Sequence, residues 1–240
     1  MRLDLFLYET GLCISRSEAK SFIVDGAVTV DGKTVKKPAF EVSQANLVDV
    51  DRSTKRYVSR GGLKLEAALN TFGVECEGAL ALDVGASSGG FTDCLLKHGA
   101  LRVIAVDSGT SQLVSSLRND ARVVSMENYN ARYMTPDDLE YVPTVAVMDV
   151  SFISAKLIIP AVYECLSERG TFICLIKPQF EVGRANIGKG GIVKSAKARE
   201  SALSDVIGFA RSVGFDFLGS MISPIEGGDG NIEYLAHFRK

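Results

Sequence analysis

The chain has 240 residues, of which 46% are hydrophobic and 23% charged, with a formal net charge of −2. Length and apolar content suit one large domain with a small module, and they exclude a chain that is disordered throughout. Five dispersed cysteines favour reduced thiols in a cytoplasmic protein over a disulfide framework or a metal site. No run of about 20 apolar residues occurs, so no membrane span is expected.

The first 50 residues predict two short helices followed by a small sheet. Apolar residues at helical spacing over 3–7 suggest the first helix. "SRSE" at 15–18 has the form of a capping box, which starts a second helix near residue 16, and Gly26 ends it. "AVTVDGKTV" predicts a hairpin with Asp31 and Gly32 in its turn.

Several basic side chains fall on this small module. Arg16 and Lys20 are expected to share the outer face of the second helix, and Lys36 lies just beyond the hairpin. They form either an ordinary solvated face or an edge that contacts phosphates. The stretch "RLDLFLYETGLCISRSEAKSFIVDGAVTVDGKTV" resembles the small RNA-binding domain named after the fourth small-subunit ribosomal protein. This resemblance implies binding to structured RNA through these side chains.

A polar, basic stretch, "DRSTKRYVSRGG", separates the module from the rest of the chain. It is interpreted as a linker because it has little periodicity and ends in two glycines. The predicted division is an RNA-binding domain over 1–52, a linker over 53–62 and a large domain over 63–240. Arg60, within the linker, is a further candidate for RNA contact.

The large domain alternates short apolar runs with helix-like segments. The expected strands lie in "ALALDV", "LRVIAVD", "ARVVSM", "TVAVMDV" and "TFICLIK". Such alternation predicts a mostly parallel sheet covered by helices on both faces, a Rossmann-like α/β fold. The last two runs, "FLGSMIS" and "IEYLAHF", are expected to form an antiparallel hairpin that completes a seven-stranded sheet.

The turn "LDVGASSGGFTD" follows the first of these strands. It matches neither the phosphate-binding GxxxxGK[ST] pattern nor the dinucleotide GxGxxG pattern. Asp83 would repel a pyrophosphate but suits an ammonium, and Gly85 and Gly89 allow the backbone to approach a ligand. Asp107, at the tip of the next strand, can accept hydrogen bonds from ribose hydroxyls.

A ligand with a ribose, a positive charge and no phosphate is therefore expected, and S-adenosylmethionine fits this description. A nicotinamide dinucleotide is the main rival, but its glycine spacing is missing. The candidate cofactor-binding residues are Asp83, Gly85, Ser87, Ser88, Gly89, Gly90, Phe91, Asp107, Asn128 and Asp149.

Four charged residues are expected to meet at the sheet edge. Asp149 and Lys177 each end a buried strand, Lys64 begins the first large-domain helix, and Glu233 begins the last strand. Lys64 and Glu233 taken singly could be ordinary surface charges, whereas a lysine that ends a buried strand needs a partner. Methyl transfer to a ribose hydroxyl requires a base, and Lys177 can serve only when neutral. Lys64 and a sulfonium would favour that state, and the carboxylates would oppose it.

These four residues resemble the Lys-Asp-Lys-Glu tetrad of FtsJ-like ribose 2′-O-methyltransferases in order and motif context. With "SRGGLKLEAAL", "MDVSFIS", "LIKPQFEVGR" and "GNIEYL", nearly the whole chain resembles the TlyA-type family, which also carries a hemolysin label. The resemblance implies a methyltransferase that modifies cytidine 2′-hydroxyls of ribosomal RNA, with ribosomal RNA or ribosomal subunits as partners and Lys177 as the base. In the acidic turn "EGGDGN", Glu226 and Asp229 depart from the family pattern.

The glycine-rich, basic stretch 180–194 follows Lys177. It is either a plain loop or a lid that contacts RNA through Arg184, Lys189 and Lys194. The alternative function is an RNA-binding assembly factor or hemolysin-like protein with a vestigial cofactor pocket. The intact carboxylates and tetrad residues favour the enzyme.

Overall fold

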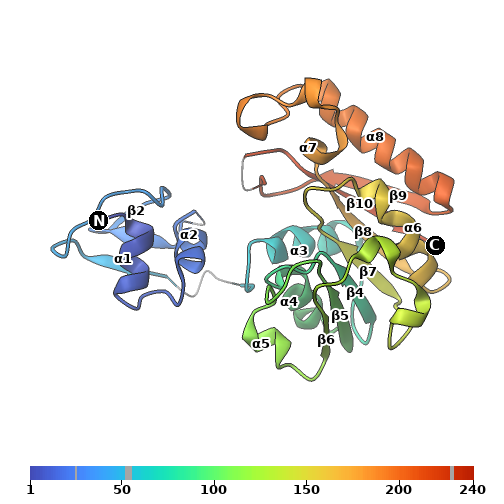
Figure 1. Cartoon of the computed structure of the whole chain (residues 1–240), viewed down its shortest axis with the longest axis horizontal. Coiled ribbons are helices and arrows are strands. Elements are labelled where there is room, and N and C mark those ends of the chain that lie inside the picture. The colour runs from blue at the N-terminus through green and yellow to red at the C-terminus, as the bar shows by residue number, and fades with distance from the viewer. Residues whose placement is uncertain (25, 52–55, 228–229) are drawn as a thin grey trace. The chain divides into compact units, whose positions relative to one another are not determined.

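The structure is a computed structural model that describes residues 1–24, 26–51, 56–227 and 230–240. The chain divides into two compact units, Met1–Arg60 and Gly61–Lys240 (Figure 1). This division falls inside the stretch predicted as a linker, part of which lies outside the described residues. The exact domain limits stay a prediction.

The smaller unit holds two helices and a three-stranded antiparallel sheet of order β2-β1-β3. Apolar residues of both helices pack on the sheet, with Leu3, Leu7 and Ile23 fully buried. Asp31 and Gly32 have φ values of 50° and 75°, the positive values that a tight primed hairpin turn requires. The elements are α1 (Leu3–Glu9), α2 (Arg16–Val24), β1 (Val28–Val30), β2 (Lys33–Thr34) and β3 (Val48–Val50).

The larger unit is built on a seven-stranded sheet of order β6-β5-β4-β7-β8-β10-β9. The first five strands in this order are parallel, and β10 runs antiparallel to both β8 and β9. The predicted parallel sheet with a terminal antiparallel hairpin is thus confirmed. The strands are β4 (Leu80–Val84), β5 (Arg102–Val106), β6 (Val123–Met126), β7 (Val145–Met148), β8 (Thr171–Ile176), β9 (Asp216–Ile222) and β10 (Tyr234–Arg239).

Helices cover both faces of this sheet (Figure 1). Neighbouring residues of a strand point to opposite faces. His237 of β10 stacks on Phe72 of α3, whereas Phe238 packs against Phe215 just beyond α8, so α3 and α8 lie on opposite sides. The helices are α3 (Gly61–Phe72), α4 (Gly90–Lys97), α5 (Ser115–Arg118), α6 (Ile159–Cys165), α7 (Pro178–Glu181) and α8 (Ala196–Val213). Short 3₁₀ turns are η2 (Ala131–Tyr133), η3 (Pro136–Asp138), η4 (Ala155–Leu157), η5 (Arg184–Asn186) and η6 (Lys189–Gly191).

The strand register brings the predicted polar residues to one edge of the sheet. Val84 pairs with Val106 on one side and with Met148 on the other, so the residues after these three strands emerge together. Tyr234 pairs with Ile176, which places the residue before β10 across from the residue after β8. None of the helices in the described parts of the chain has the length and apolarity that crossing a bilayer requires.

Candidate active site

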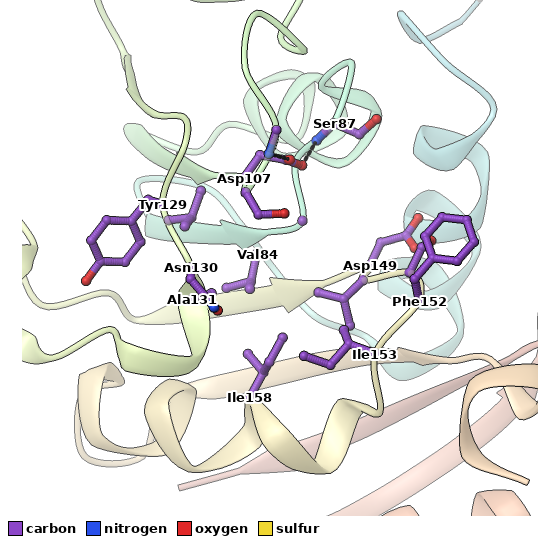
Figure 2. A pocket seen from close by; sticks show the side chains of 16 residues that line it. Val84, Ser87, Asp107, Tyr129, Asn130, Ala131, Asp149, Phe152, Ile153 and Ile158 are labelled. Atoms are coloured by element: carbon purple, nitrogen blue, oxygen red, sulfur yellow. Dashed lines mark hydrogen bonds between the residues drawn. The ribbon is translucent and has the colours of Figure 1, made fainter. Parts of the chain in front are cut away.

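The carboxyl ends of β4, β5 and β7 border a cavity of about 380 Å³, large enough for a small-molecule ligand (Figure 2). Asp107 and Asp149 supply its carboxylates, and Ile153 and Ile158 form part of its apolar wall. None of the described residues that line it is a lysine or arginine. The carboxylates and the apolar wall suit a ligand with ribose hydroxyls and an apolar portion. The lining offers no positively charged side chain for a phosphate.

The glycine turn is shaped by contacts that no larger residue could make. A Cβ on Gly85, at φ +84°, would lie 2.4 Å from the carbonyl oxygen of Asp149. Gly85 therefore lets the ends of β4 and β7 approach closely while it lines the cavity. A Cβ on Gly89 would lie 2.3 Å from the side chain of Leu117, so Gly89 serves helix packing rather than the cavity wall.

Asp83 is fully buried directly before the cavity-lining residues. Its Oδ2 accepts a hydrogen bond of 2.6 Å from Thr92 Oγ1, while its Oδ1 has no donor among the described residues. Burial raises the pKa of this carboxyl to about 7, and the negative charges of Asp149 and Asp107 add to the effect. An acceptor left without a donor fits the predicted role of Asp83 toward a cationic group.

Asp107 is fixed at the cavity wall by two backbone groups. Its Oδ2 accepts from the backbone N–H of Ser87 at 2.7 Å, and its Oδ1 accepts from that of Gly109 at 2.7 Å (Figure 2). Each carboxylate oxygen can accept a further hydrogen bond. Asp107 is therefore held in place and can still receive the hydroxyls of a ribose.

The structure does not bring all the predicted cofactor residues to the cavity. Ser87 lines it, but Asp83, which is buried behind it, and Ser88, Gly89, Gly90, Phe91 and Asn128 do not. Tyr129, Asn130 and Ala131 lie there instead, as labelled in Figure 2. The sequence reasoning missed this segment because it belongs to an irregular connection without periodicity. The only signal available was its position after the strand β6.

The four predicted tetrad residues form two ion pairs. Lys64 Nζ lies 2.5 Å from Glu233 Oε2, and both side chains are largely buried. Lys177 Nζ lies 2.6 Å from Asp149 Oδ1, which has no aligned hydrogen-bond donor among the described residues. Asp149 also lines the cavity, so the tetrad and the cavity share a wall.

Further side chains complete this arrangement, and the sequence reasoning did not single them out. Ser151 Oγ accepts a hydrogen bond of 2.7 Å from Lys177 Nζ, and Gln179 Nε2 lies 3.5 Å from Glu233 Oε1. Phe152 has a φ of 64° and is 92% exposed, and its ring centroid lies 5.3 Å from that of Phe180. The signal that could have indicated these side chains is their position in the sequence, within three residues of Asp149 or Lys177.

The predicted RNA contacts differ in their surroundings. Lys20 and Lys36 are exposed, whereas Arg16 Nη2 donates to Asp4 Oδ2 at 3.1 Å. Asp4 is fully buried, and hydrogen bonding from Arg2 lowers the pKa of its carboxyl to about 2. Arg16 thus also supports the fold of the small unit. Arg60 is half-buried, and Arg184, Lys189 and Lys194 are exposed beyond α7.

Comparison with known families identifies both parts of the chain. The family model described as FtsJ-like methyltransferase matches residues 57–240, and the S4 domain model matches residues 1–48. The chain belongs to the FtsJ-like methyltransferase family. Like other members, it is an S-adenosylmethionine-dependent methyltransferase, and the nicotinamide alternative is set aside. Among the described residues, no three His, Cys, Asp or Glu side chains are grouped to hold a metal ion.

Relatives of this FtsJ-like methyltransferase confirm the TlyA-type resemblance. Hemolysin A of Brachyspira hyodysenteriae is 46% identical over 99% of both chains. The 16S/23S rRNA (cytidine-2′-O)-methyltransferase TlyA of Mycobacterium tuberculosis is 41% identical over 99% of this chain and 89% of its own. A solved structure from Streptococcus thermophilus that carries the name hemolysin is 46% identical. It matches with a TM-score of 0.80 over 100% of this chain and 88% of its own.

Proposed function

We propose that this FtsJ-like methyltransferase methylates the 2′-hydroxyl of cytidine in ribosomal RNA. The observation that carries the proposal is the junction at Asp149, where the lysine–carboxylate pairs of the tetrad meet the cavity. A cavity alone would fit many methyltransferases, whereas an adjoining lysine provides a base for a hydroxyl substrate. The name of the Mycobacterium tuberculosis relative supports cytidine and ribosomal RNA as the acceptor.

The residues that would hold S-adenosylmethionine are those of the glycine turn and the next strand end. Asp107 would accept hydrogen bonds from the ribose hydroxyls, and Asp83 and the Gly85 turn would face the cationic portion. The cofactor, when bound, supplies an electrophilic methyl group on a sulfonium. Ile153 and Ile158 would pack against the apolar parts of the cofactor in this part of the cavity.

Lys177 is the proposed general base. Its Nζ lies between Asp149 Oδ1 and Ser151 Oγ, which fix the nitrogen beside the cavity. In its neutral state the nitrogen would take the proton of the ribose hydroxyl as the oxygen–methyl bond forms. Asp149 and Ser151 position the nitrogen, and after the transfer the lysine, now an ammonium, pairs with the Asp149 carboxylate.

Glu233 and Lys64 are proposed to orient the acceptor. The register between β8 and β10 places Glu233 across from Lys177, and the buried ion pair with Lys64 fixes its carboxylate. A carboxylate at this position can accept a hydrogen bond from a ribose hydroxyl. Holding the acceptor oxygen in line supplies much of the rate of such a displacement.

The small unit is proposed to bind the RNA that carries the acceptor. Its match to the S4 domain and its exposed Lys20 and Lys36 support contacts to phosphates. The partner is ribosomal RNA, either alone or within a ribosomal subunit. Because this substrate is cytoplasmic, we place the protein in the cytoplasm.

The test is transfer of a labelled methyl group from S-adenosylmethionine to purified ribosomal subunits and to ribosomal RNA. We expect label in RNA and, after nuclease digestion, in 2′-O-methylcytidine. Label in ribosomal protein, in a base or in another nucleoside would contradict the proposal. Catalytically inactive Lys177→Met protein serves as the background control.

A further inference from the structure

A strongly basic segment follows α7 and leads into α8. Residues 182–199 contain five lysines and arginines and no acidic residue. Arg184, Lys189, Lys194 and Lys197 are exposed, and none of the four forms an ion pair within the described residues. We refer to residues 182–199 as the basic segment. Such an uncompensated run of positive charge suits an anionic polymer.

A buried side chain from a distant part of the chain holds the basic segment in place. Asn231 is 1% exposed, and its Oδ1 accepts from the backbone N–H of Val193 at 3.0 Å. Its Nδ2 donates to the carbonyl oxygen of Gly191 at 3.0 Å. Arg199 also holds this stretch, donating to the carbonyl oxygens of Val193 and Lys194 at 2.9 and 2.8 Å.

Asn231 belongs to the connection that shapes the surroundings of Glu233. It precedes Glu233 by two residues, and its carbonyl oxygen accepts from the backbone N–H of Gly227 at 2.8 Å. A Cβ on Gly227 would lie 2.5 Å from Glu233 Oε1, so this turn packs directly on the tetrad carboxylate. The basic segment begins five residues after Lys177 and is anchored back beside Glu233. The segment therefore starts close in sequence to Lys177 and is held at Gly191 and Val193 by the turn beside Glu233.

We propose that Asn231 is a positioning residue that fixes the basic segment beside the tetrad, so that its exposed cations bind RNA phosphates next to the acceptor nucleotide. The inference rests on the proposed function. Phosphate contacts carry little sequence information, but they set the register of the RNA on the protein. A segment held by Asn231 beside Glu233 keeps its cations in one arrangement next to the acceptor hydroxyl, whereas a free segment would make fewer phosphate contacts and bind RNA more weakly.

The Asn231→Ala variant separates this role from catalysis. It leaves Val193 N–H and Gly191 C=O without their partners, so the segment loses its anchor. We expect the KM for RNA to rise about tenfold, with a smaller change in kcat. The plot of log affinity against log salt should become shallower by about 1 to 2, as losing one or two phosphate contacts predicts. The dissociation constant for S-adenosylmethionine, measured by calorimetry, should change less than about twofold.

A double-mutant cycle tests whether Asn231 acts through the cations. In a variant with Arg184, Lys189 and Lys194 all changed to glutamine, adding Asn231→Ala should have little further effect on RNA affinity. Additive losses would show that Asn231 acts elsewhere and would overturn the proposal. RNA binding is measured by fluorescence anisotropy without cofactor, so the readout does not depend on turnover.

Ser223→Ala is the matched control. Ser223 is also buried in the β9–β10 connection, but its Oγ donates to the carbonyl oxygen of Ile225 and not to the basic segment. It should lower the melting temperature without changing the salt dependence of RNA binding. Equal salt dependence for wild type and Asn231→Ala would overturn the positioning role. Absence of RNA methylation by the wild type would instead contradict the proposed function.

Discussion

At the scale of single residues, the position of the Lys177 nitrogen is fixed by two oxygen atoms. Lys177 Nζ contacts Asp149 Oδ1 at 2.6 Å and Ser151 Oγ at 2.7 Å. A methionine keeps much of the length of the side chain and removes the nitrogen. We expect Lys177→Met to lower methyl transfer by about 10² to 10⁴-fold, the range that general base catalysis supplies. Methyl incorporation into RNA is the assay.

Binding of S-adenosylmethionine to Lys177→Met, measured by calorimetry, should stay within about twofold of wild type, because Lys177 does not line the cavity. The control is Lys97→Met. Lys97 also pairs with a carboxylate, Asp93, at 3.0 Å, but it lies exposed on α4. This control should keep full activity. A Lys177→Met enzyme as active as the control would remove Lys177 as the base.

Asp83 makes stability depend on pH in a defined direction. Its pKa is about 7 in the folded protein, well above the value of 3.8 expected in the unfolded chain. Between these values the native state holds a proton that the unfolded state releases, so stability falls as pH rises from about 4 to 7. The contribution is at most about 1.4 kcal/mol for each pH unit.

Asn cannot titrate, so Asp83→Asn should lack this contribution. Urea unfolding without cofactor, at pH 5 and pH 7, gives the free energy of unfolding of both proteins. We expect wild type to lose more stability than Asp83→Asn between the two pH values. An identical pH dependence for both would show that Asp83 is not protonated in the native state.

At the scale of elements, the sequence predicted the sheet because each strand carries a strong local pattern. Buried parallel strands form short apolar runs, and the terminal hairpin has an evident turn. The four-residue helix α7 was not predicted, because "PQFE" is too short to show a helical period. Irregular segments such as Tyr129–Ala131 also carry no period, which is why they were missed.

For the tetrad too, local sequence patterns predicted only part of the arrangement. Asp149 and Lys177 could be predicted because a charge directly after a buried strand is conspicuous. Which carboxylate pairs with which lysine could not be predicted. That choice depends on β10 lying next to β8, and on α3 bringing Lys64 to Glu233, which is 169 residues away in the chain. Such pairings follow from the tertiary arrangement rather than from any local pattern.

A substitution at Gly85 tests whether the fold and the cofactor site need the close approach of the ends of β4 and β7. Gly85→Ala would place a Cβ 2.4 Å from the Asp149 carbonyl oxygen and would force a non-glycine residue to φ +84°. We expect the free energy of unfolding to fall by about 2–4 kcal/mol, since backbone strain and a displaced strand end add together. Cofactor binding should weaken as well, because Gly85 lines the cavity. Urea unfolding and calorimetry measure the two effects.

Gly78→Ala is the matched control for strain alone. Gly78 has a φ of 68°, and a Cβ there meets nothing within 4 Å. It should destabilise by only about 1 kcal/mol and leave cofactor affinity unchanged. If the two substitutions had equal effects, the close approach of Gly85 to Asp149 would carry no cost of its own.

At the scale of the whole molecule, the chemistry is assigned to one unit, and RNA contacts are proposed for both units. The cavity and the tetrad lie in Gly61–Lys240, whereas the S4 match lies in Met1–Arg60. Within the small unit, basic residues have unequal roles. Replacing Arg16 would remove one of the donors to the buried Asp4 carboxylate, so its effect would mix folding with RNA binding. Lys20 and Lys36 are exposed and give a cleaner test.

The double variant Lys20→Gln/Lys36→Gln should weaken RNA binding and leave the chemical step intact. Two lost phosphate contacts should make the plot of log affinity against log salt shallower by about 1.4 to 1.8. At saturating RNA, kcat should match wild type, because neither lysine belongs to the unit that holds the tetrad. Lys97→Gln removes an exposed positive charge from the larger unit and should change neither quantity. A fall in kcat with unchanged RNA affinity would show that these lysines do not act in substrate capture.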